Sequence, residues 1–559
     1  MSVTDADSLT IYVYSHRSPP VVTFSSLNSY KLLPQEMNEE FAVDPAQLLG
    51  AASDFSQQLG AISDASAQEF LNRFPLPAII GALQTDASYP GLESALVECL
   101  ERIFRTKYGA SLIPHFMPFV IVGLGADSQK VKRLACICIS CLLENTDRRV
   151  AVQLVLQNDI YPLLLGCLID GDEQVAAAST DAIKGLASYP ESMGIVFPAN
   201  VNEATHLGNI AAKCSSLGRV RVLALIVKLF SISRSAASEV SKSNLLSLLE
   251  AEVKNTNDTL VTLSVLELIY ELVEVQHSAE FLSKTILLQL LSSIISNGAA
   301  ESILRSRAMM ITGRLLSKEN AFAFIDESSF KNVLSAIDKR FEFLESQDAD
   351  ECECALEALG QIGSSFQGAT MVLSNTPPIG RHVVDAAFDR QQHGKQLAAL
   401  HSLANIAGET RMGNNVFLTS AAEENLKSLI YDKASKTPKL IPSGLLLSVL
   451  QQDSEIRVAG YRLISGLVAR TWCLIEIISR PEIIEIVTDT LTETNKIGME
   501  ARHKCCETVL GAFTSSSKLV NDPAYSGLVS KLQEAIRNGP YGARKRTEAQ
   551  PQVATADRF

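Results

Sequence analysis

The sequence predicts an all-α solenoid, and three observations predict it. The chain has 559 residues, several times the length that one hydrophobic core supports, so it must divide into domains or repeat a smaller unit. Hydrophobic residues make up 47% and charged residues 20%, which is typical of a packed chain rather than a disordered one. Apolar residues also recur in successive copies with the spacing of one helix face, and no strand-rich segment interrupts them.

The repeated template places apolar residues at i, i+3, i+7, i+8 and i+11, and it occurs in four clear copies and five looser ones. The clear copies begin at Val131, Val175, Val261 and Ile456, and the looser ones begin near Val220, Leu304, Cys352, Leu397 and Ala501. Most neighbouring starts lie between 40 and 50 residues apart, which is the length of two- or three-helix HEAT and armadillo repeats. We therefore expect about nine or ten helical repeats, each stable only when it is stacked on its neighbours.

The clearest copy shows why each unit is expected to fold as a helical pair. Asn158 and Asp159 are candidate N-caps before Pro162, and proline is tolerated in a first turn because its missing N–H would have no partner there. A short apolar helix is then expected over residues 163–169. The Asp-Gly-Asp sequence at 170–172 ends it, because glycine gives a permissive backbone and aspartate caps the next helix. That second helix is expected over residues 175–187.

The ends of the chain differ from the repeats. Residues 1–36 contain two adjacent prolines and lack helical periodicity, so we expect a loosely structured N-terminal extension. The solenoid is expected over residues 37–538, with an internal loop near 433–442, where prolines and lysines accumulate. Residues 539–559 are expected to form a flexible basic tail.

The charge balance restricts the class of partner. With 49 Lys and Arg against 62 Asp and Glu, the net charge is −13, which argues against broad binding to nucleic acid or to an anionic membrane surface. The apolar stretches are also shorter than the roughly 18 residues that a transmembrane helix needs. We therefore expect no nucleic acid or membrane partner, and basic protein surfaces fit the chain better.

Eleven cysteines are spread over the whole chain. A disulfide framework is typical of short secreted chains, so we interpret these residues as reduced thiols packed as small hydrophobes. The expected location is the cytoplasm, with the nucleus as a second compartment. Cys136, Cys138 and Cys141 do not share one helix face, which excludes a tetrahedral zinc site built from the three.

Signals for catalysis are weak. The sequence has no phosphate-binding loop of the Gly-Lys-Ser/Thr type, no His-Glu-x-x-His and no Gly-x-Ser-x-Gly. His503, Cys505 and Cys506 are adjacent on a helix that sends them in different directions, so they do not form a nucleophile and base. The glycines at 360–363 are interpreted as a helix C-cap and loop. We predict that the chain is not an enzyme and has no cofactor and no metal.

An acidic cluster is the one candidate site. Its residues are Glu342, Glu345, Asp348, Asp350, Glu351 and Glu353, at an expected turn between two helices. Such a turn is often a solvated one with N-cap carboxylates. The alternative is a docking site for a basic partner, for which the candidates are Glu345, Asp348, Asp350 and Glu351. The basic tail at 544–546 similarly fits either a nuclear-import patch or a solubilising end.

Several ordered motifs between residues 70 and 541 resemble the 26S proteasome non-ATPase regulatory subunit 5 family. They are Phe-Glu-Phe-Leu-Glu-Ser-Gln-Asp at 341–348, Ala-Leu-Glu-Ala-Leu-Gly-Gln-Ile-Gly-Ser-Ser at 355–365, Glu-Ile-Arg at 455–457 followed by Trp472, Ser-Arg-Pro at 479–481, Val-Thr-Asp at 487–489, Asn-Asp-Pro-Ala-Tyr at 521–525 and Gly-Pro-Tyr at 539–541. Their shared order carries the resemblance. The chain departs from the family before Met37 and in the length of its tail.

The resemblance implies a function. Members of this family are HEAT/armadillo-like assembly chaperones of the base of the 26S proteasome regulatory particle. They bind the C-terminal domain of an AAA-ATPase subunit and so delay docking on the 20S core. The implied partners are AAA-ATPase subunits, with 26S regulatory subunit 7 first among them, and base subcomplexes. The alternative is another armadillo-type scaffold or transport adaptor, although the single Trp472 excludes the tryptophan ladder of import receptors.

Overall fold

The computed structural model describes residues 44–84, 89–200, 202–255, 258–344, 349–374, 376–411, 418–516, 519, 522 and 525–541. Over these ranges every regular element is a helix and none is a strand, which confirms the all-α prediction. The predicted extension at 1–36 and the tail from residue 542 lie outside the described residues. Packing divides the chain into two compact units, Met1–Asp147 (unit 1) and Arg148–Phe559 (unit 2), each described here by itself.

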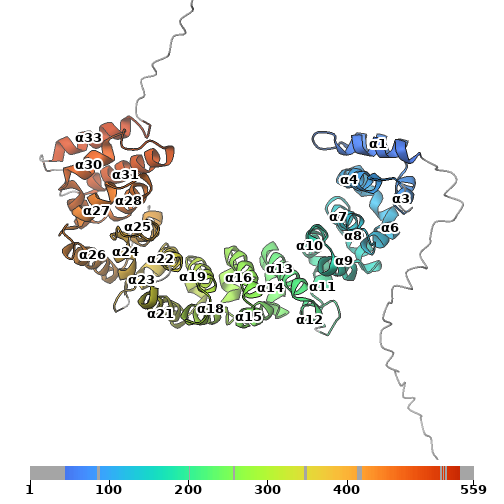
Figure 1. The fold of residues 1–559 in the computed structure, drawn as a ribbon, viewed down its shortest axis with the longest axis horizontal. Coiled ribbons are helices and arrows are strands. Elements are labelled where there is room, and N and C mark those ends of the chain that lie inside the picture. The colour runs from blue at the N-terminus through green and yellow to red at the C-terminus, as the bar shows by residue number, and fades with distance from the viewer. Residues whose placement is uncertain are drawn as a thin grey trace, which may run out of the picture. The chain divides into compact units, whose positions relative to one another are not determined.

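The helices of unit 1 are α1 (Pro45–Ser56), α2 (Asp64–Arg73), α3 (Leu76–Gln84), α4 (Leu92–Phe104), α5 (Lys107–Leu112), the 3₁₀ helix η3 (Ile113–Phe116), α6 (Met117–Leu124) and α7 (Gln129–Asn145). Helices three positions apart in the chain pack on each other: α4 packs on α1, α7 packs on α4 and α5 packs on α2. Unit 1 therefore contains two three-helix repeats, α2 to α4 and α5 to α7, preceded by α1 (Figure 1).

The first helices of unit 2 are α8 (Arg148–Gln157), α9 (Ile160–Asp170), α10 (Glu173–Ala187), η4 (Pro190–Ser192), α11 (Met193–Val196), α12 (Leu207–Lys213), α13 (Ser216–Ile232), α14 (Arg234–Lys242), α15 (Leu246–Lys254), α16 (Thr259–Glu274), α17 (Ser278–Leu282), α18 (Leu287–Ser296) and α19 (Ser302–Leu316). The later helices are α20 (Ala321–Phe324), α21 (Glu327–Leu344), α22 (Ala349–Ile362), α23 (Phe366–Ser374), α24 (Gly380–Ala387), α25 (His393–Ala407), η5 (Glu409–Arg411), α26 (Ser420–Ser435), α27 (Pro442–Leu450), α28 (Ser454–Leu467), α29 (Thr471–Ile478), α30 (Pro481–Thr488), α31 (Lys496–Ser515) and α33 (Ser526–Arg537).

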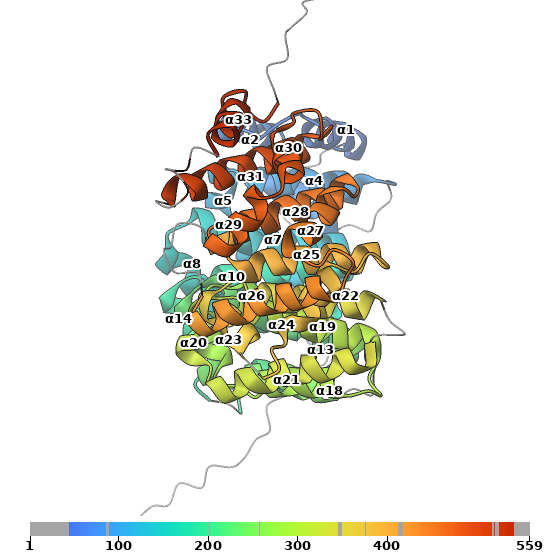
Figure 2. The same cartoon turned by 90° about the vertical axis from the view of Figure 1, so that its left-hand side faces the viewer.

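The repeat of unit 2 also has three helices. The third helices form one continuous layer, in which α10, α13, α16, α19, α22, α25, α28 and α31 each pack on the next; we call this layer A. Second helices cover it, since α15 packs on α16, α18 on α19 and α27 on α28. Figure 2 shows α25, α28 and α31 one above the other. The described part of unit 2 thus contains eight repeats, from α8–α10 to α29–α31. Together with the two repeats of unit 1 this makes ten, which agrees with the expectation of nine or ten.

The sequence template identified the layer A helices. All nine predicted copies fall on α7 of unit 1 or on a layer A helix of unit 2, within the first six residues of each. Equivalent template positions are buried, as Leu186 and Leu467 show at 0% and 1% exposure. Polar N-caps begin several of these helices, including Asp172, whose carboxylate accepts from the backbone N–H of Val175 at 2.8 Å.

Two details of the predicted repeat were wrong. The unit is a helical triplet, because a first helix, such as α14 or α17, precedes each pair, and α14 packs on α17. Asp159 does not cap α9 with its side chain; its backbone is left-handed, at φ 48°, and α9 begins at Ile160. Asp159 therefore turns the chain between α8 and α9, a conformation that Asp tolerates better than most residues.

The glycines at 360–363 agree with the prediction only in part. Gly363 directly follows the last residue of α22, as expected at a helix C-terminus. Gly360 lies within α22 and is buried rather than in a loop. A Cβ atom built there would lie 2.6 Å from the Cα of Ser402 in α25, and one built on Gly363 would lie 2.3 Å from a side-chain carbon of Ile406. The absent side chains thus let α22 and α25 approach closely within layer A.

The C-terminal end of unit 2 is fixed to α31. The fully buried Arg502 donates to the carbonyl of Val487 at 2.9 Å and to that of Pro540 at 3.2 Å. The hydroxyl of Tyr541 donates to Glu500 Oε1 at 2.6 Å. The Gly-Pro-Tyr motif therefore covers the last layer A helix, and Gly539 provides the left-handed turn that it needs, at φ 71°.

Two further expectations concern the internal loop and a membrane-spanning helix. Residues 436–441 connect α26 to α27, within the range where a loop is expected. In the described ranges no single helix has both the length and the apolar composition to cross a bilayer; the bent pair α8 and α9, at 76° to each other, passes that test only when taken together.

Candidate partner-binding surface

The four predicted site residues have three different outcomes. Glu345 and Asp348 lie outside the described residues. Asp350 is the second residue of α22, and its side chain is exposed. Glu351 is the next residue, yet its side chain is fully buried.

Glu351 is held between two arginines of unit 2. Its Oε1 accepts from Arg305 Nε of α19 at 2.8 Å and from Arg340 Nε of α21 at 2.6 Å. Its Oε2 accepts from Nη2 of the same two arginines at 2.7 and 3.3 Å. Burial raises the pKa of this carboxyl, but the hydrogen bonds from the two arginines outweigh it and hold the pKa below its usual value.

This position corrects the interpretation of Glu351 as a surface charge. Its carboxylate already pairs with two cations of its own chain and is not presented to solvent, so it fixes α19, α21 and α22 against one another. Of the four candidates, only Asp350 is seen to face solvent in the described part of the chain.

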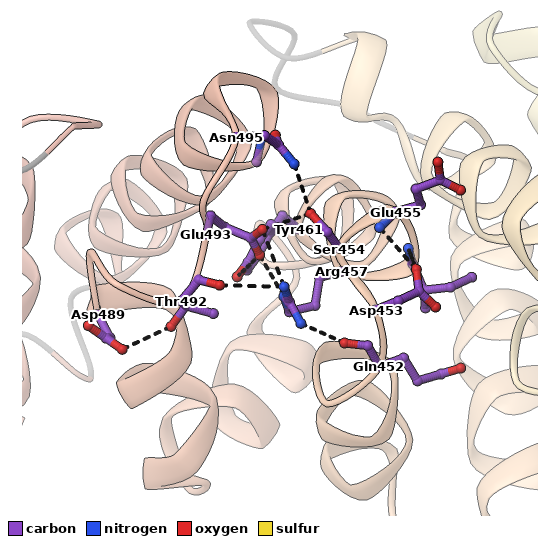
Figure 3. Close-up of polar contacts among 12 residues, drawn as sticks. Gln452, Asp453, Ser454, Glu455, Arg457, Tyr461, Asp489, Thr492, Glu493 and Asn495 are labelled. Atoms are coloured by element: carbon purple, nitrogen blue, oxygen red, sulfur yellow. Dashed lines mark hydrogen bonds and ion pairs between the residues drawn. The ribbon is translucent and has the colours of Figure 1, made fainter.

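A similar arrangement recurs three repeats later, as Figure 3 shows. Glu493, 2% exposed, accepts from Arg457 Nε of α28 at 2.6 Å, from the hydroxyl of Tyr461 at 3.1 Å and from that of Ser454 at 2.9 Å. Arg457, like Arg305, is the fourth residue of its layer A helix, and each also donates to the carbonyl five residues before it. These clusters act as links between successive repeats.

Exposed acidic side chains of α16 are paired across layer A. Glu271 accepts from Lys228 of α13 at 2.7 Å, and Glu267 and Glu274 bind Arg307 and Arg314 of α19. The negative charge of α16 is therefore neutralised by the helices on either side of it.

The acidic side chains of α22 are arranged differently. Asp350, Glu353 and Glu357 lie at i, i+3 and i+7, on one helix face, and we call them the acidic stripe. None forms an ion pair with a described Lys, Arg or His. Burial raises the pKa of the Cys354 thiol, and the charges of Glu357, Glu353 and Asp350 raise it further, which indicates a negative local potential.

Glu357 is not among the residues predicted from the sequence. Grouping acidic residues by their proximity in the chain instead joined Glu351 to its neighbours. Helical spacing was the signal available, because residues 350, 353 and 357 share a face of the predicted helix whereas residue 351 points away from it. With that spacing, the stripe is predicted and Glu351 is excluded.

The cysteines of α31 and α7 lie in the core, whereas His503 is half-buried and pairs with Glu507. Cys505 and Cys506 are fully buried in α31, and burial raises the pKa of the Cys506 thiol to about 11. Cys136, Cys138 and Cys141 are buried in α7, and burial raises the pKa of Cys141 to about 11 as well. Thiols of this kind stay protonated and unreactive at neutral pH. The described residues hold no group of three or more His, Cys, Asp or Glu arranged to bind a metal ion.

Comparison with known proteins gives the family. The family model described as "Proteasome non-ATPase 26S subunit" matches residues 92–559. The chain belongs to this family. The 26S proteasome non-ATPase regulatory subunit 5 of Homo sapiens is 20% identical over 454 residues, which cover 80% of this chain and 84% of that protein. The Bos taurus protein of the same name is 22% identical over 457 residues, with the same shares covered. These matches confirm the resemblance found in the sequence.

Solved structures of other proteins match this member of the family only loosely. An engineered protein matches 77% of this chain and 98% of its own, at 15% identity and a TM-score of 0.41. A designed armadillo repeat protein in complex with the peptide (KR)4 matches 47% of this chain and 99% of its own, at 14% identity and a TM-score of 0.35.

Proposed function

We propose that this protein is an assembly chaperone for the base of the 26S proteasome regulatory particle. It binds the C-terminal domain of an AAA-ATPase subunit, with 26S regulatory subunit 7 as the first candidate. The bound chaperone keeps the ATPase ring from docking on the 20S core until the base is complete. It works in the cytoplasm, and in the nucleus as a second compartment, where its eleven cysteine thiols stay reduced.

One observation carries the proposal, the family match over residues 92–559 to proteins named as regulatory subunits of the 26S proteasome. Two features of the chain support it. A solenoid presents a long surface assembled from many repeats, which suits the recognition of a folded domain. The acidic stripe of α22 adds a negative face that has no ion-pair partner among the described residues, which suits a basic docking surface.

Native gels of extracts that contain the tagged protein test the proposal. The protein is expected in free base subcomplexes together with proteasomal ATPases, and it is expected to be depleted from particles that contain the 20S core. Detection only in intact 26S particles would instead identify a constitutive subunit. Absence from every proteasomal species, with nuclear cargo or other clients in its place, would favour the scaffold or transport adaptor.

A reconstitution separates chaperoning from mere association. Excess purified protein is expected to slow the joining of the ATPase ring to the 20S core, because a bound solenoid sterically blocks the docking face. The peptidase activity of isolated 20S core serves as the control and should not change. An unchanged joining rate at saturating protein would contradict the steric mechanism even if the protein binds the base.

A further inference from the structure

Three aliphatic side chains are exposed at the same position of three successive repeats. Leu217, Leu260 and Ile303 are the second residues of α13, α16 and α19, and they are 61%, 77% and 51% exposed. One exposed aliphatic side chain is ordinary on a protein surface. Three at equivalent positions on adjacent helices form a line, which we call the aliphatic row, and lines of this kind mark interaction surfaces.

The row is continuous because its helices are neighbours. In layer A, α13 packs on α16 and α16 packs on α19 (Figure 1). Packed helix axes lie about 8–10 Å apart, so the row extends for about 20 Å. On the next helix, α22, the second residue is Asp350, the first member of the acidic stripe. An apolar line therefore leads directly into a negative surface.

The spacing of the row selects the secondary structure of its partner. Residues seven apart on an α-helix lie on nearly the same face, about 10.5 Å apart along its axis, which is close to the distance between neighbouring layer A helices. Residues on one face of a β-strand lie about 6.7 or 13 Å apart, and neither distance fits. A helix laid across the row can therefore place one apolar side chain on each of Leu217, Leu260 and Ile303.

We propose that the aliphatic row binds an amphipathic helix of a partner protein. This helix carries apolar side chains at every seventh residue and, one heptad further, basic side chains that meet Asp350, Glu353 and Glu357. The inference deepens the proposed function and rests on it for the source of the helix, a subunit of the regulatory-particle base. The helical and basic character of the partner follows from the row and the stripe themselves.

Binding of a synthetic probe to the full chain tests this proposal. The probe is a fluorescent peptide of about 25 residues with leucine at every seventh position and lysines in the following turn. A second peptide has the same composition with the leucines scattered around the helix. Wild-type protein should bind the first at least about tenfold more tightly than the second, since only the first can bury all three leucines at once.

Two triple variants locate the binding. The variant Leu217→Ser, Leu260→Ser, Ile303→Ser should lose about tenfold or more in affinity for the heptad peptide. The matched control Leu156→Ser, Leu491→Ser, Ile475→Ser removes three comparably exposed aliphatic side chains that are not at this position of a layer A helix, and it should keep wild-type affinity. Both sets are on the surface, and thermal unfolding confirms that each variant is folded. Equal losses in the two variants, or equal affinity of the wild type for the two peptides, overturn the proposal.

Capture of purified base subcomplexes by the same proteins separates this inference from the proposed function. If the wild type and the control variant capture the base and the row variant captures less of it, the aliphatic row is supported as the docking site. Wild-type capture that the row variant retains in full overturns the row while the proposed function stands. If wild-type protein captures no base, the proposed function fails, and the peptide experiment still decides whether the row binds a helix.

Discussion

Single buried carboxylates link neighbouring repeats of unit 2. Glu351 binds Arg305 and Arg340, and Glu493 binds Arg457. A buried ion pair need not add net stability compared with an apolar replacement, because desolvation offsets the attraction. Removal of one partner is different, since it leaves a buried charge without compensation. The contribution of these carboxylates to the free energy of unfolding is therefore best measured by substituting them.

Glu351→Ala should destabilise unit 2 by about 3–5 kcal/mol, because two buried guanidinium groups lose their shared acceptor. Chemical denaturation followed by circular dichroism measures the change. Asp350→Ala is the control at the neighbouring residue; its side chain is exposed, so its change should stay within about 0.5 kcal/mol. Equal effects of the two substitutions would show that Glu351 does not hold the helices together.

The same carboxylate should give the protein an acid-sensitive component of stability. The pKa of Glu351 is lowered in the folded chain, so its contribution is fully present above the unfolded pKa of about 4.3 and is lost as the pH falls through the lower folded value. Glu351→Gln cannot titrate, so its denaturation midpoint should fall less steeply than that of the wild type below about pH 4.3. Parallel curves for the two proteins would contradict this assignment.

Helices of layer A approach one another through small residues. A Cβ atom built on Gly313 of α19 would lie 2.8 Å from the Cα of Ala358 in α22, and one built on Gly360 would lie 2.6 Å from the Cα of Ser402 in α25. The Ser402 hydroxyl also donates across the same contact to the carbonyl of Leu356 at 2.9 Å. Each glycine thus lies against the backbone of the next helix, so neither helix can yield without moving as a whole.

Two glycine substitutions separate packing from helix propensity. Gly360→Ala should destabilise the protein by about 1–3 kcal/mol, because the new methyl group overpacks the contact with α25. Gly511→Ala, in the interior of α31 with open space around it, should stabilise it by about 0.5–1 kcal/mol. Thermal unfolding of both variants gives the sign of each change in stability. A gain in stability for Gly360→Ala would show that α22 and α25 are not in close contact.

A sequence predicts long helices with a periodic apolar face better than it predicts short helices. Layer A helices have 14 or more residues, enough for an apolar face to recur several times, and the template found them. Short first helices such as α17, with five residues, carry little more than one turn and gave no periodic signal. Helical spacing separates Glu351 from the exposed face of α22, but a sequence does not show the arginines of α19 and α21 that bind it in the core. Asp350 lies in the first turn of α22 with its side chain exposed, and its role in partner binding stays a prediction.

Stability at the scale of the whole molecule should follow from its repeats. Each repeat contacts mainly its neighbours, so unfolding need not be all-or-none. Leu186→Ala and Leu467→Ala remove equivalent buried side chains at distant positions of unit 2, and each should cost about 2–5 kcal/mol locally. Hydrogen exchange should show lost protection in α8–α13 for the first and in α27–α31 for the second. Uniform loss along unit 2 in either variant would indicate a single cooperative core instead.

The acidic stripe should govern how the whole molecule meets its partner. If Asp350, Glu353 and Glu357 face a basic surface of an AAA-ATPase subunit, the variant Asp350→Asn, Glu353→Gln, Glu357→Gln should associate with it more slowly, by about threefold to tenfold at low salt, with a flatter dependence on ionic strength. Dissociation should change less, because exposed charges act mainly on the encounter. The control variant Glu98→Gln, Glu485→Gln, Glu534→Gln removes the same net charge at exposed sites away from the stripe and should keep the wild-type rate. Stopped-flow binding at several salt concentrations measures the association rates of both variants. A wild-type rate and salt dependence for the stripe variant would show that the stripe is a solvated helix face without a role in association.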